Sequence, residues 1–585
     1  MGSLQSIPQI VDKYGHDRHR LLDIIRDVHA DRGYLADEDV EAIAKTLGIH
    51  RIEIHDTATF YHFFSRTPRG RTVVRLCKAV VEKQHGMPAV AEAFEKAAGC
   101  RFGETSADGT FSLQYVSCIG MSDQPPSALI DGSVVTALKP ADVPGIVAMI
   151  RAGTWVTGST VETNLRCTGP VIFAPLERGH AVRSAVNRSP EEVVAEITNS
   201  KLRGRGGAGF PTGMKWDFCR KTTADAHYVV CNADEGEPGT FKDRVVFTEV
   251  PDLLFEGMTV AGYAVGASEG IVYLRAEYEY LLPGLLEVLD RRRRLGLLGR
   301  NICGKEGFDF DVRIQMGAGS YVCGEESSLL ESAEGRRGAP RTRPPFPVTR
   351  GYRNQPTALN NAETLCCAAR ILAKGADWFA AQGTRDSTGT KLLSVSGDCA
   401  RPGTYEVEFG LSVNKLLALV GADEAAAVQV GGPSGTCVAP KDFGRKICYE
   451  DLSTGGSVMV FGPGRDMLEV VRDFTEFFAE ESCGWCAPCR VGTEVLLRML
   501  DEIRDGRGTQ DHLYRMMQLG DTVKACSRCG LGQTAVNPFL TTLRNMRDIY
   551  TERLSAHEYV PRLDLKKAVA FSEELAGHRS EVKEE

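Results

Sequence analysis

The stretch that decides the fold is GRGGAGFPTGMKW at residues 204–216, a glycine-dense loop that runs into an expected helix. A chain uses glycine where its backbone must take a positive φ or approach a ligand closely, and N–H groups near a helix start suit a phosphate. A flexible surface loop is the alternative. The glycine spacing fits a dinucleotide fingerprint, but that fingerprint needs a preceding strand, whereas residues 189–197 carry the Ser-Pro start of a helix. We therefore expect a different phosphate-bearing cofactor at this loop.

The length and composition set the class of protein. A chain of 585 residues is too long for a single hydrophobic core and predicts several domains. An apolar fraction of 43% and a charged fraction of 25% are ordinary for a globular protein, and the net charge of -8 argues against nucleic acid as a general partner. No apolar run approaches the ~20 residues that cross a bilayer, and the chain does not open with a signal-peptide pattern. We therefore expect a cytoplasmic protein without direct membrane insertion.

Hydrophobic periodicity predicts a multidomain α/β protein. In the first unit, helical patterns are followed by strand-like runs that end at Cys77 and Cys118. The expected units are a first unit over residues 1–155, a connector over 156–180, the largest unit over 181–385, a small β-rich module over 386–445 and a helical region over 446–585.

Polar side chains follow the expected buried strand at residues 228–231. Asp234, Glu235 and Glu237 place three carboxylates within four residues, which would repel one another, so a solvated acidic loop is one interpretation. Their place directly after an apolar strand favours a ligand site, because α/β folds bind ligands there. Asn360 and Asn361 precede another expected helix, where they could bind a phosphate or a ring carbonyl, or only cap the helix.

The strongest chemical signal is the run CGWCAPC at residues 483–489. A C-x2-C-x2-C run presents three thiolates around one centre, and a fourth cysteine downstream completes a 4Fe-4S site. Zinc is the rival, but it usually takes paired C-x2-C units. The fourth ligand is Cys529 or Cys526. We favour Cys529, because the Gly-Leu-Gly that follows it would let the backbone approach a cluster closely.

The first unit resembles a known protein family. Residues 5–155, including HDTATFY at 55–61 and DQPP at 123–126, resemble the thioredoxin-like 2Fe-2S subunit of respiratory complex I. That family carries two cysteines at each strand end, whereas this chain keeps Cys77 and Cys118 but has Glu82 and Ser122 at the second positions. Two thiolates are too few for the usual four-cysteine site. A cluster with oxygen ligands is the alternative, but we expect a fold retained for docking, without a 2Fe-2S cluster.

Residues 185–550 resemble the NADH-binding flavoprotein of complex I. The glycine loop, the acidic loop, the segment YVCGEE at 321–326, the paired asparagines and the cysteine run occur in that family's order. The fusion of both units, with the cysteines of the first depleted, is most similar to the diaphorase flavoprotein subunits of soluble NAD-reducing nickel-iron hydrogenases. The resemblance implies a Rossmann-like FMN and NADH domain, a ubiquitin-like module and a C-terminal helical bundle with an iron-sulfur cluster.

The resemblance also assigns cofactor contacts by position. It places FMN against Gly204, Arg205, Gly206, Lys215, Asn232, Asp234, Glu235, Gly324, Asn360, Asn361 and Thr364. It places NAD(H) over the flavin, against Phe210, Phe218, Glu237 and Glu326, and it places Tyr321 near the flavin. Further cofactor-binding residues that it implies are Glu325 and Arg343. Relatives commonly have lysine at the last of these positions, so the charge is kept but the geometry is not. The implied 4Fe-4S ligands are Cys483, Cys486, Cys489 and Cys529.

The implied reaction needs no protein nucleophile or catalytic acid. Hydride would move between NAD(H) and FMN, and single electrons between FMN and the 4Fe-4S cluster, while the protein orients the groups. The implied partners are an iron-sulfur diaphorase subunit and nickel-iron hydrogenase subunits. A diaphorase subunit of NAD-dependent formate dehydrogenase or of NADH-quinone oxidoreductase is the alternative among enzymes. A flavin-free electron-relay protein and a zinc-structural protein are alternatives from other classes.

Overall fold

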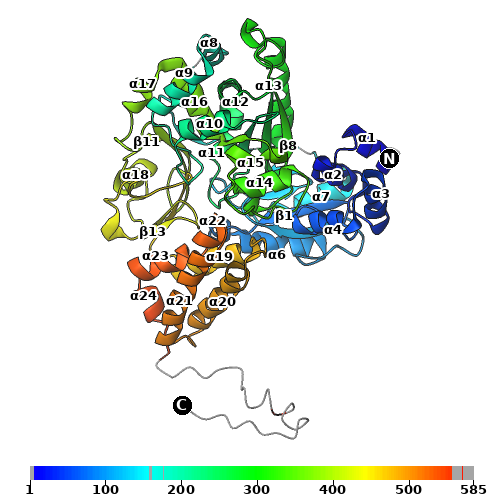
Figure 1. Cartoon of the computed structure of the whole chain (residues 1–585). Coiled ribbons are helices and arrows are strands. Elements are labelled where there is room, and N and C mark those ends of the chain that lie inside the picture. Colours follow the sequence, from blue (N-terminus) through cyan, green and yellow to red (C-terminus); the bar gives the residue numbers. More distant parts are fainter. Residues whose placement is uncertain (1–4, 157, 159–160, 176, 556–569, 571–585) are drawn as a thin grey trace.

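A computed structural model describes residues 5–156, 158, 161–175, 177–555 and 570 (Figure 1). At its centre lies a parallel four-stranded sheet in the order β8-β7-β6-β9. Its strands are β6 (Tyr228–Ala233), β7 (Glu269–Leu274), β8 (Asp311–Met316) and β9 (Thr357–Asn361). All three neighbouring pairs are parallel, as the Rossmann-like prediction requires.

Apolar helices cover one face of this sheet. Residues of α12 and α16 that share a core with residues of β6 and β7 include Met258, Leu365, Val229 and Val272. The two helices approach closely at Gly257, where a Cβ would lie 2.0 Å from the carbonyl oxygen of Leu365. The helices of this domain are α8 (His180–Val186), α9 (Pro190–Asn199), α10 (Thr212–Lys221), α11 (Lys242–Glu249), α12 (Pro251–Val265), α13 (Leu282–Arg294), α14 (Glu326–Ala333), α15 (Pro347–Arg350), α16 (Ala362–Lys374) and α17 (Ala376–Ala380).

The helix expected before the glycine loop is confirmed. Ser189 caps α9 by accepting a hydrogen bond from the Glu192 backbone, and the Glu192 side chain bonds back to the cap. Pro190 occupies the first turn, where its missing N–H costs nothing. The glycine loop therefore does not follow a strand, and it does not stand where the dinucleotide fingerprint would put it.

The four helices between residues 7 and 60 pack on the central sheet and not on the sheet of the thioredoxin-like fold. Their helices are α1 (Ile7–Lys13), α2 (Leu21–Arg32), α3 (Asp37–Leu47) and α4 (Arg51–Phe60). Ile24, Ile25 and Ile54 share a core with Val230 of β6 and Ile271 of β7. A parallel sheet needs apolar cover on both faces, and these helices supply part of the second cover. The unit predicted over 1–155 is thus two packing units.

The thioredoxin-like part has its own four-stranded sheet in the order β2-β1-β3-β4. Strands β1 and β2 are parallel, and β3 and β4 continue the sheet antiparallel. The elements are β1 (Thr72–Cys77), α5 (Val80–Gln84), α6 (Met87–Ala98), β2 (Phe111–Val116), β3 (Ala128–Ile130), β4 (Ser133–Val135) and α7 (Val143–Ala152). The unit is joined to α11 by a buried ion pair, in which Arg244 Nη2 lies 2.9 Å from Asp123 Oδ2.

The small module is larger than the predicted 386–445. Its six-stranded sheet has the order β13-β12-β14-β10-β11-β5, so a strand from the predicted helical region lies inside it and a strand from the predicted connector forms its edge. The sequence prediction missed both strands because each is short and gains its hydrogen bonds only from distant partners. The elements are β5 (Leu165–Cys167), β10 (Thr390–Gly397), β11 (Gly403–Glu408), α18 (Val413–Val420), β12 (Ala427–Val430), β13 (Thr436–Val438) and β14 (Ser457–Phe461).

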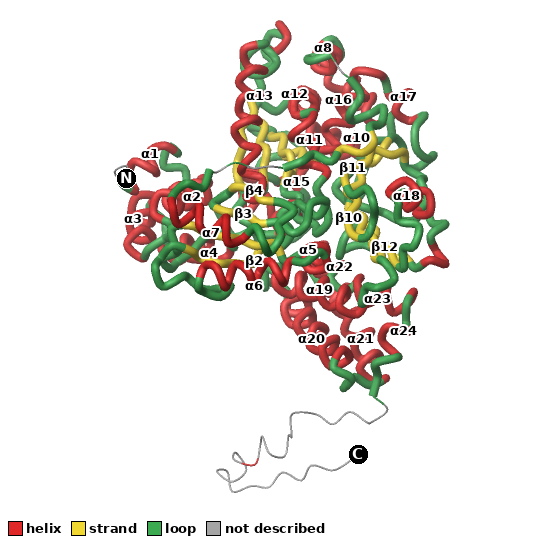
Figure 2. The backbone as a smooth tube through the Cα atoms, turned by 180° about the vertical axis from the view of Figure 1, so that it is seen from behind, coloured by secondary structure: helices red, strands yellow, loops and turns green. Residues whose placement is uncertain are grey.

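The C-terminal region is helical, as predicted, and projects from one end of the molecule (Figure 1). Viewed from behind, it lies below the module and the thioredoxin-like unit (Figure 2). Its helices are α19 (Met467–Glu480), α20 (Ala487–Arg504), α21 (Gln510–Cys526), α22 (Gly530–Thr534), α23 (Asn537–Asn545) and α24 (Asp548–Thr551). Leu468, Leu496, Met516 and Phe539 belong to one core that these helices share.

Candidate functional site

The strand order of the central sheet reverses at β6, and we call the edge outside the carboxyl ends of β6 and β9 the crevice. The chain builds β6, β7 and β8 outward on one side and then returns to place β9 on the other side of β6. Open α/β sheets bind ligands outside the carboxyl ends of the strands at such a reversal. The acidic segment 232–239 begins in the last two residues of β6, and the paired asparagines end β9. Two motifs that are far apart in sequence therefore meet at the reversal.

The glycine loop lies against the same edge. A Cβ on Gly206 would be 3.3 Å from the Asn361 Cβ, and the Arg205 backbone N–H donates to Thr364 Oγ1 at 2.9 Å. Gly207 and Gly209 have φ values of 130° and 65°, which residues with a side chain rarely adopt. The loop thus brings bare backbone to the first turn of α16.

The Arg205 side chain has a different task from its backbone. Its guanidinium is fully buried, donates to the Thr388 carbonyl at 2.7 Å and lies 4.7 Å from the centre of the Phe409 ring. These contacts hold the glycine loop to the neighbouring module. The side chain is therefore a structural tie, and only the backbone of this residue faces the first turn of α16.

The acidic loop divides its carboxylates among separate tasks. Asn232 Nδ2 donates to the Gly324 carbonyl at 2.7 Å, and its Oδ1 accepts from the Asp234 backbone at 3.1 Å. Asp234 Oδ2 is buried and has no hydrogen-bond partner within the described part of the chain. Burial raises the pKa of Asp234 well above its usual range. An unpartnered buried carboxyl oxygen at a crevice is suited to a ligand that can share a hydrogen bond with it.

Glu235 is occupied by the protein. Its carboxylate accepts from the Asp243 backbone at 2.8 Å and from the Tyr278 hydroxyl at 2.9 Å, at the start of α11. Burial raises its pKa to about 7. The structure therefore gives this side chain a capping role, and it does not bring the carboxylate to the glycine loop.

Glu237 joins three parts of the chain. Its Oε2 accepts from the Tyr321 hydroxyl at 2.6 Å, and its Oε1 accepts from the Ser434 backbone at 2.8 Å. Removal from water raises the pKa of Glu237 to about 7, against these two hydrogen bonds. Tyr321 also packs edge-on against Phe477 of α19, with ring centres 4.9 Å apart. A change at Glu237 can thus act through Tyr321 on α19, the helix that precedes the cysteine run.

Charged side chains gather beside the end of β9. Lys215 Nζ donates to the Leu359 carbonyl at 3.0 Å and to Glu326 Oε2 at 3.2 Å. Arg343 lies 3.1 Å from Glu325 and 3.4 Å from Glu326, so the arginine at the lysine position pairs with the GEE segment. Glu325 also caps α14 through its other oxygen. Asn360 Oδ1 accepts from Trp216 Nε1 at 2.9 Å and is thereby engaged in the core.

Apolar side chains near these charges are exposed. Phe210 and Phe218 are each 45% exposed, on the loop before α10 and on α10 itself. Met214 on α10 and Phe346 next to α15 are exposed as well, and sequence reasoning missed both. In the sequence, Met214 is marked only by its helical spacing from Phe218. Phe346 is marked only as an aromatic residue within the proline-rich basic loop. Exposed aromatic rings beside a charged crevice are suited to stacking on a flat ligand.

Sequence reasoning also missed a buried charge cluster behind the site. Lys242 Nζ lies 2.6 Å from Asp243 and 3.3 Å from Glu363, and Lys391 Nζ lies 2.5 Å from Glu363. Asn361 Nδ2 donates to Asp243 Oδ2 at 2.7 Å. Local sequence does not mark these lysines as a pair, because both contact Glu363, which is distant from each of them in the chain.

The groups at this crevice fit an FMN. Bare backbone meets the start of α16, as a phosphate requires, and Lys215 supplies a nearby cation. Asp234 Oδ2 offers a hydrogen-bonding position that the described protein does not use. The fit rests on these groups, with Asn232 and Asn361 beside them.

The expected cluster cysteines lie together in the C-terminal region. Cys489 and Cys529 are buried in one apolar cluster with Phe478 and Leu531, and Cys483 and Cys486 pack against it. Burial raises the pKa of Cys529 to about 11, while the backbone N–H groups of Leu531 and Gly532 act in the opposite direction. Cys526, the alternative fourth ligand, is exposed.

The arrangement of these sulfurs differs from that of a single-metal site. Among the residues that the structure describes, no three His, Cys, Asp or Glu side chains converge on one ion position. The thiolates of a cubane cluster bind different irons, so they need not converge in this way. The packing is compatible with the expected cluster, and ligation by these cysteines remains a prediction.

The two cysteines of the thioredoxin-like unit form a separate place. Cys77 ends β1, Cys118 follows β2, and both are buried. Glu82 is fully buried and accepts from the Ser127 backbone at 2.9 Å and its hydroxyl at 2.8 Å. Ser122 Oγ lies 3.6 Å from Cys118 Sγ. With two thiols and an engaged carboxylate, this place does not fit a four-cysteine 2Fe-2S cluster.

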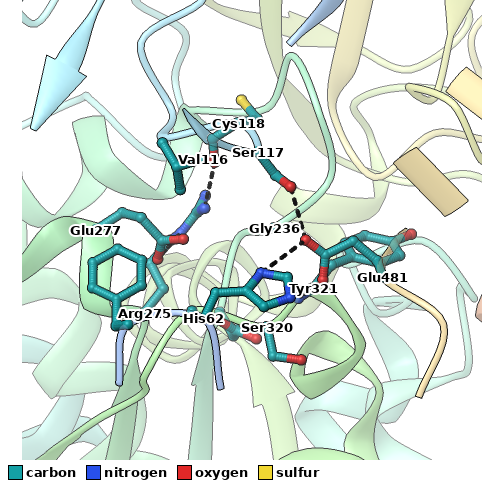
Figure 3. Close-up of a pocket in the computed structure, with 13 residues that line it drawn as sticks. His62, Val116, Ser117, Cys118, Gly236, Arg275, Glu277, Ser320, Tyr321 and Glu481 are labelled. Atoms are coloured by element: carbon teal, nitrogen blue, oxygen red, sulfur yellow. Dashed lines mark hydrogen bonds and ion pairs between the residues drawn. The ribbon is translucent and has the colours of Figure 1, made fainter. Parts of the chain in front are cut away.

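A cavity lies beside Cys118, and the acidic loop lines it as well (Figure 3). It lies where three parts of the chain meet, and its lining includes Ser117, Cys118, Asp234 and Tyr321. Figure 3 shows Ser117 and His62 both pointing at Glu481, which accepts from Ser117 Oγ at 2.8 Å. The cavity is not the proposed flavin crevice itself, since the glycine loop does not line it.

Comparison with known proteins agrees with this geometry. Family models match for the Nuo51 FMN-binding domain over residues 197–370, the thioredoxin-like [2Fe-2S] ferredoxin over 7–151 and the iron-sulfur binding region of NADH-ubiquinone oxidoreductase over 469–553. The second match corrects one expectation, because it gives no support to the view that a 2Fe-2S cluster is unlikely in that domain. The family match favours a 2Fe-2S cluster in this domain, whereas the presence of only two of the family's cysteines argues against one.

Two of three similar proteins cover nearly the whole chain, and the third covers two thirds of it. NAD-reducing hydrogenase HoxS subunit alpha of Cupriavidus necator is 47% identical over 98% of this chain and 99% of its own. NADP-reducing hydrogenase subunit HndC of Solidesulfovibrio fructosivorans is 42% identical over 67% of this chain and 80% of its own. A chain from the crystal structure of an NAD+-reducing nickel-iron hydrogenase in the H2-reduced state has a TM-score of 0.88 and 37% identity, with 97% of this chain and 98% of that chain covered.

Within the described residues, none of the helices has the length and apolar content needed to span a membrane. The domains, their order and the similarity from end to end agree with one another. The chain therefore belongs to the family of the NAD-reducing hydrogenase alpha subunit.

Proposed function

We propose that this chain is the diaphorase subunit of an NAD-reducing hydrogenase, which transfers hydride between NAD(H) and FMN and single electrons between FMN and a 4Fe-4S cluster. The observation that carries the proposal is the crevice at the reversal of strand order. There the glycine loop, the acidic loop and the first turn of α16 meet, in a chain similar from end to end to an NAD-reducing hydrogenase subunit.

FMN, when bound, supplies both two-electron and one-electron chemistry in one ring. In this proposal the backbone of Gly204, Arg205 and Gly206, with the start of α16 at Asn361 and Thr364, holds the phosphate. Lys215 adds positive charge beside it. Asn232, Asp234 and Gly324 hold the polar edge of the ring, and the unpartnered Asp234 oxygen supports this assignment. Glu235 and Asn360 act indirectly, since the protein already uses their side chains.

NAD(H) binds on the exposed side of the crevice in this proposal. Phe210 and Phe218 stack on the adenine end, and their exposure supports this role. Glu326 and Arg343 contact polar groups of the dinucleotide, with Glu325 as their partner. Glu237 binds near the nicotinamide end and is positioned by Tyr321. The protein thereby orients the two reacting rings and keeps water away from them.

The exit for electrons is the cysteine run. Cys483, Cys486, Cys489 and Cys529 bind the 4Fe-4S cluster, and Cys526 does not, in agreement with its exposure. Tyr321 supports this direction, because it contacts Glu237 through its hydroxyl and packs on Phe477 beside the cysteines. The iron-sulfur partner and the hydrogenase subunits then receive or supply the electrons.

The fold supports one further assignment. The strands β10 to β14 with α18 suit a ubiquitin-like module, enlarged by the edge strand β5. Arg205 and Glu237 both contact the part of the chain that contains this module. Its proposed role is to hold the glycine loop and the acidic loop in place. A cytoplasmic location stays a prediction from the sequence.

The proposal is tested by purification of the full chain with its natural partners. We expect FMN, four cluster irons on this subunit and NADH-dependent dye reduction, together with a nickel-containing subunit. Co-purification with a molybdenum subunit would instead support the formate dehydrogenase alternative. A chain that retains no flavin under conditions that preserve the iron-sulfur cluster would remove the diaphorase assignment.

A further inference from the structure

The glycine loop is closed at its neck by its own backbone. The Gly204 N–H donates to the Phe210 carbonyl at 2.9 Å, and the Thr212 N–H donates to the Leu202 carbonyl at 2.9 Å, as in an antiparallel bridge. Between these ends, the N–H groups of residues 206–209 make no hydrogen bond within the described part of the chain. A row of free N–H groups suits an anion such as a phosphate, provided that the carbonyl oxygens of the loop are directed elsewhere.

Side chains of the small module hold two of these carbonyls. Tyr449 Oη donates to the Gly204 carbonyl at 2.7 Å, and Ser453 Oγ donates to the Gly207 carbonyl at 3.4 Å. Both side chains belong to the same segment, which connects β13 and β14. The two carbonyl oxygens of the glycine loop therefore point at the module.

The peptide unit between Gly204 and Arg205 is fixed at both of its ends. A trans peptide is planar, so its C=O and its N–H point in opposite directions. The carbonyl accepts from Tyr449, and the N–H donates to Thr364 Oγ1 in the first turn of α16 at 2.9 Å. Because Thr364 Oγ1 accepts this bond, the Thr364 hydroxyl keeps a hydrogen that it can donate. Tyr449 thus directs the N–H side of the loop towards the start of α16.

The Tyr449 ring is itself held in place. The Tyr449 backbone N–H donates to Ser387 Oγ at 3.0 Å. The Arg203 guanidinium lies 4.1 Å from the centre of the tyrosine ring, and the centre of the Phe409 ring lies 5.1 Å from it. On the side of the loop, a Cβ on Gly209 would lie 2.6 Å from Tyr449 Cε1, so the ring packs directly on a glycine. The hydroxyl is therefore presented to one carbonyl from one direction.

We propose that Tyr449 is a positioning residue that makes the flavin site selective for a phosphorylated flavin. The inference rests on the proposed function, because it takes the ligand of the glycine loop to be FMN. A carbonyl oxygen repels a phosphate, whereas an N–H group attracts it. The Tyr449 hydroxyl holds the Gly204 carbonyl away from α16 and so leaves donors to face the phosphate. Asn232 and Asp234, which are proposed to hold the flavin ring, bond to each other and to Gly324, so binding of the ring should be insensitive to this tyrosine.

The test compares FMN with riboflavin, which has the same ring but no phosphate. FMN is removed from the purified holoenzyme, and each flavin is titrated back while its fluorescence is measured. Tyr449→Phe keeps the ring and removes the hydroxyl, so the Kd for FMN should rise about tenfold through loss of this hydrogen bond. The Kd for riboflavin should stay the same. Ser453→Ala should raise the Kd for FMN only about twofold, because its bond to the Gly207 carbonyl is longer.

Tyr405→Phe is the matched control in the same module. Tyr405 is buried on β11, and its hydroxyl also donates to a backbone carbonyl, that of Arg401, at 2.6 Å. The control variant thus loses the same kind of hydrogen bond away from the glycine loop. It should bind both flavins with the wild-type Kd.

Two results would overturn the proposal. One is an unchanged Kd for FMN in Tyr449→Phe. The other is an equal loss of affinity for FMN and riboflavin, which would show that the tyrosine only stabilises the fold. If riboflavin binds too weakly to be titrated, the phosphorus NMR resonance of bound FMN decides: it should shift in Tyr449→Phe but not in Tyr405→Phe, and one common resonance would contradict the proposal. Failure of the wild-type protein to bind either flavin would instead refute the proposed function.

Discussion

Replacement of Glu237 by glutamine tests the assignment of the acidic loop most sharply. The substitution keeps the size of the side chain and an oxygen that can accept from Tyr321, which is now 2.6 Å away. It removes the negative charge. FMN is expected to stay bound, because none of the groups proposed to hold it contacts this carboxylate.

The magnitude follows from the chemistry of one charged hydrogen bond. A hydrogen bond to a charged group contributes about 1.5 to 3 kcal/mol. With about 1.4 kcal/mol for each factor of ten, the KM for NADH should rise about 10- to 100-fold. The pKa of Glu237 is raised to about 7, so the carboxylate is charged above that pH and protonated below it. The wild-type KM should therefore rise as the pH falls through 7, and the KM of the variant should not depend on pH in this range.

The assay is steady-state NADH-dependent dye reduction from pH 6 to 8, with FMN measured by absorbance. Glu287→Gln serves as the control, since Glu287 is exposed on α13 and lies away from the crevice. A variant with the wild-type KM and the same pH profile would show that Glu237 does not contact the dinucleotide. A variant that loses FMN would show that the carboxylate serves the flavin instead.

Three further predictions follow from packing and exposure. Cys529→Ser should abolish the cluster absorbance and lower the bound iron, whereas Cys526→Ser should keep both; the reverse pattern would exchange the fourth ligand. Gly257→Ala should lower the free energy of unfolding by about 1–3 kcal/mol or more, measured by denaturant melts, because its Cβ would lie 2.0 Å from a backbone oxygen. Gly284→Ala on α13 is the matched control, with open space around it, and an equal effect of both changes would refute the close approach. Phe218→Ala should raise the KM for NADH without altering FMN content, by loss of stacking worth about 0.5–1.5 kcal/mol.

The motifs of the site could be found from the sequence because each depends on local chemistry. The helix before the glycine loop follows from Ser189 and Pro190, whose capping works within one turn. The acidic residues stand directly after a strand, and the cysteine run carries its own spacing. The order of these motifs was enough to indicate the family.

What the sequence could not show depends on contacts between distant segments. It did not reveal that Glu235 caps α11, that the Arg205 side chain points into the module, or that Lys242 and Lys391 share Glu363. Each of these side chains takes its role from a partner at least eight residues away. Local pattern cannot distinguish a carboxylate that meets a ligand from one that the protein has already engaged.

The chain by itself determined which chemistry is present: a phosphate loop, an acidic strand end and a thiolate run. The tertiary structure decided which of these groups remain free to bind a ligand and which the protein has already engaged. It divided the predicted first unit into two packing units. A parallel sheet needs apolar cover on both faces, and the first four helices supply part of that cover. It also placed the strand reversal beside the glycine loop, and this turned motifs more than 150 residues apart, such as Arg205 and Thr364, into one crevice.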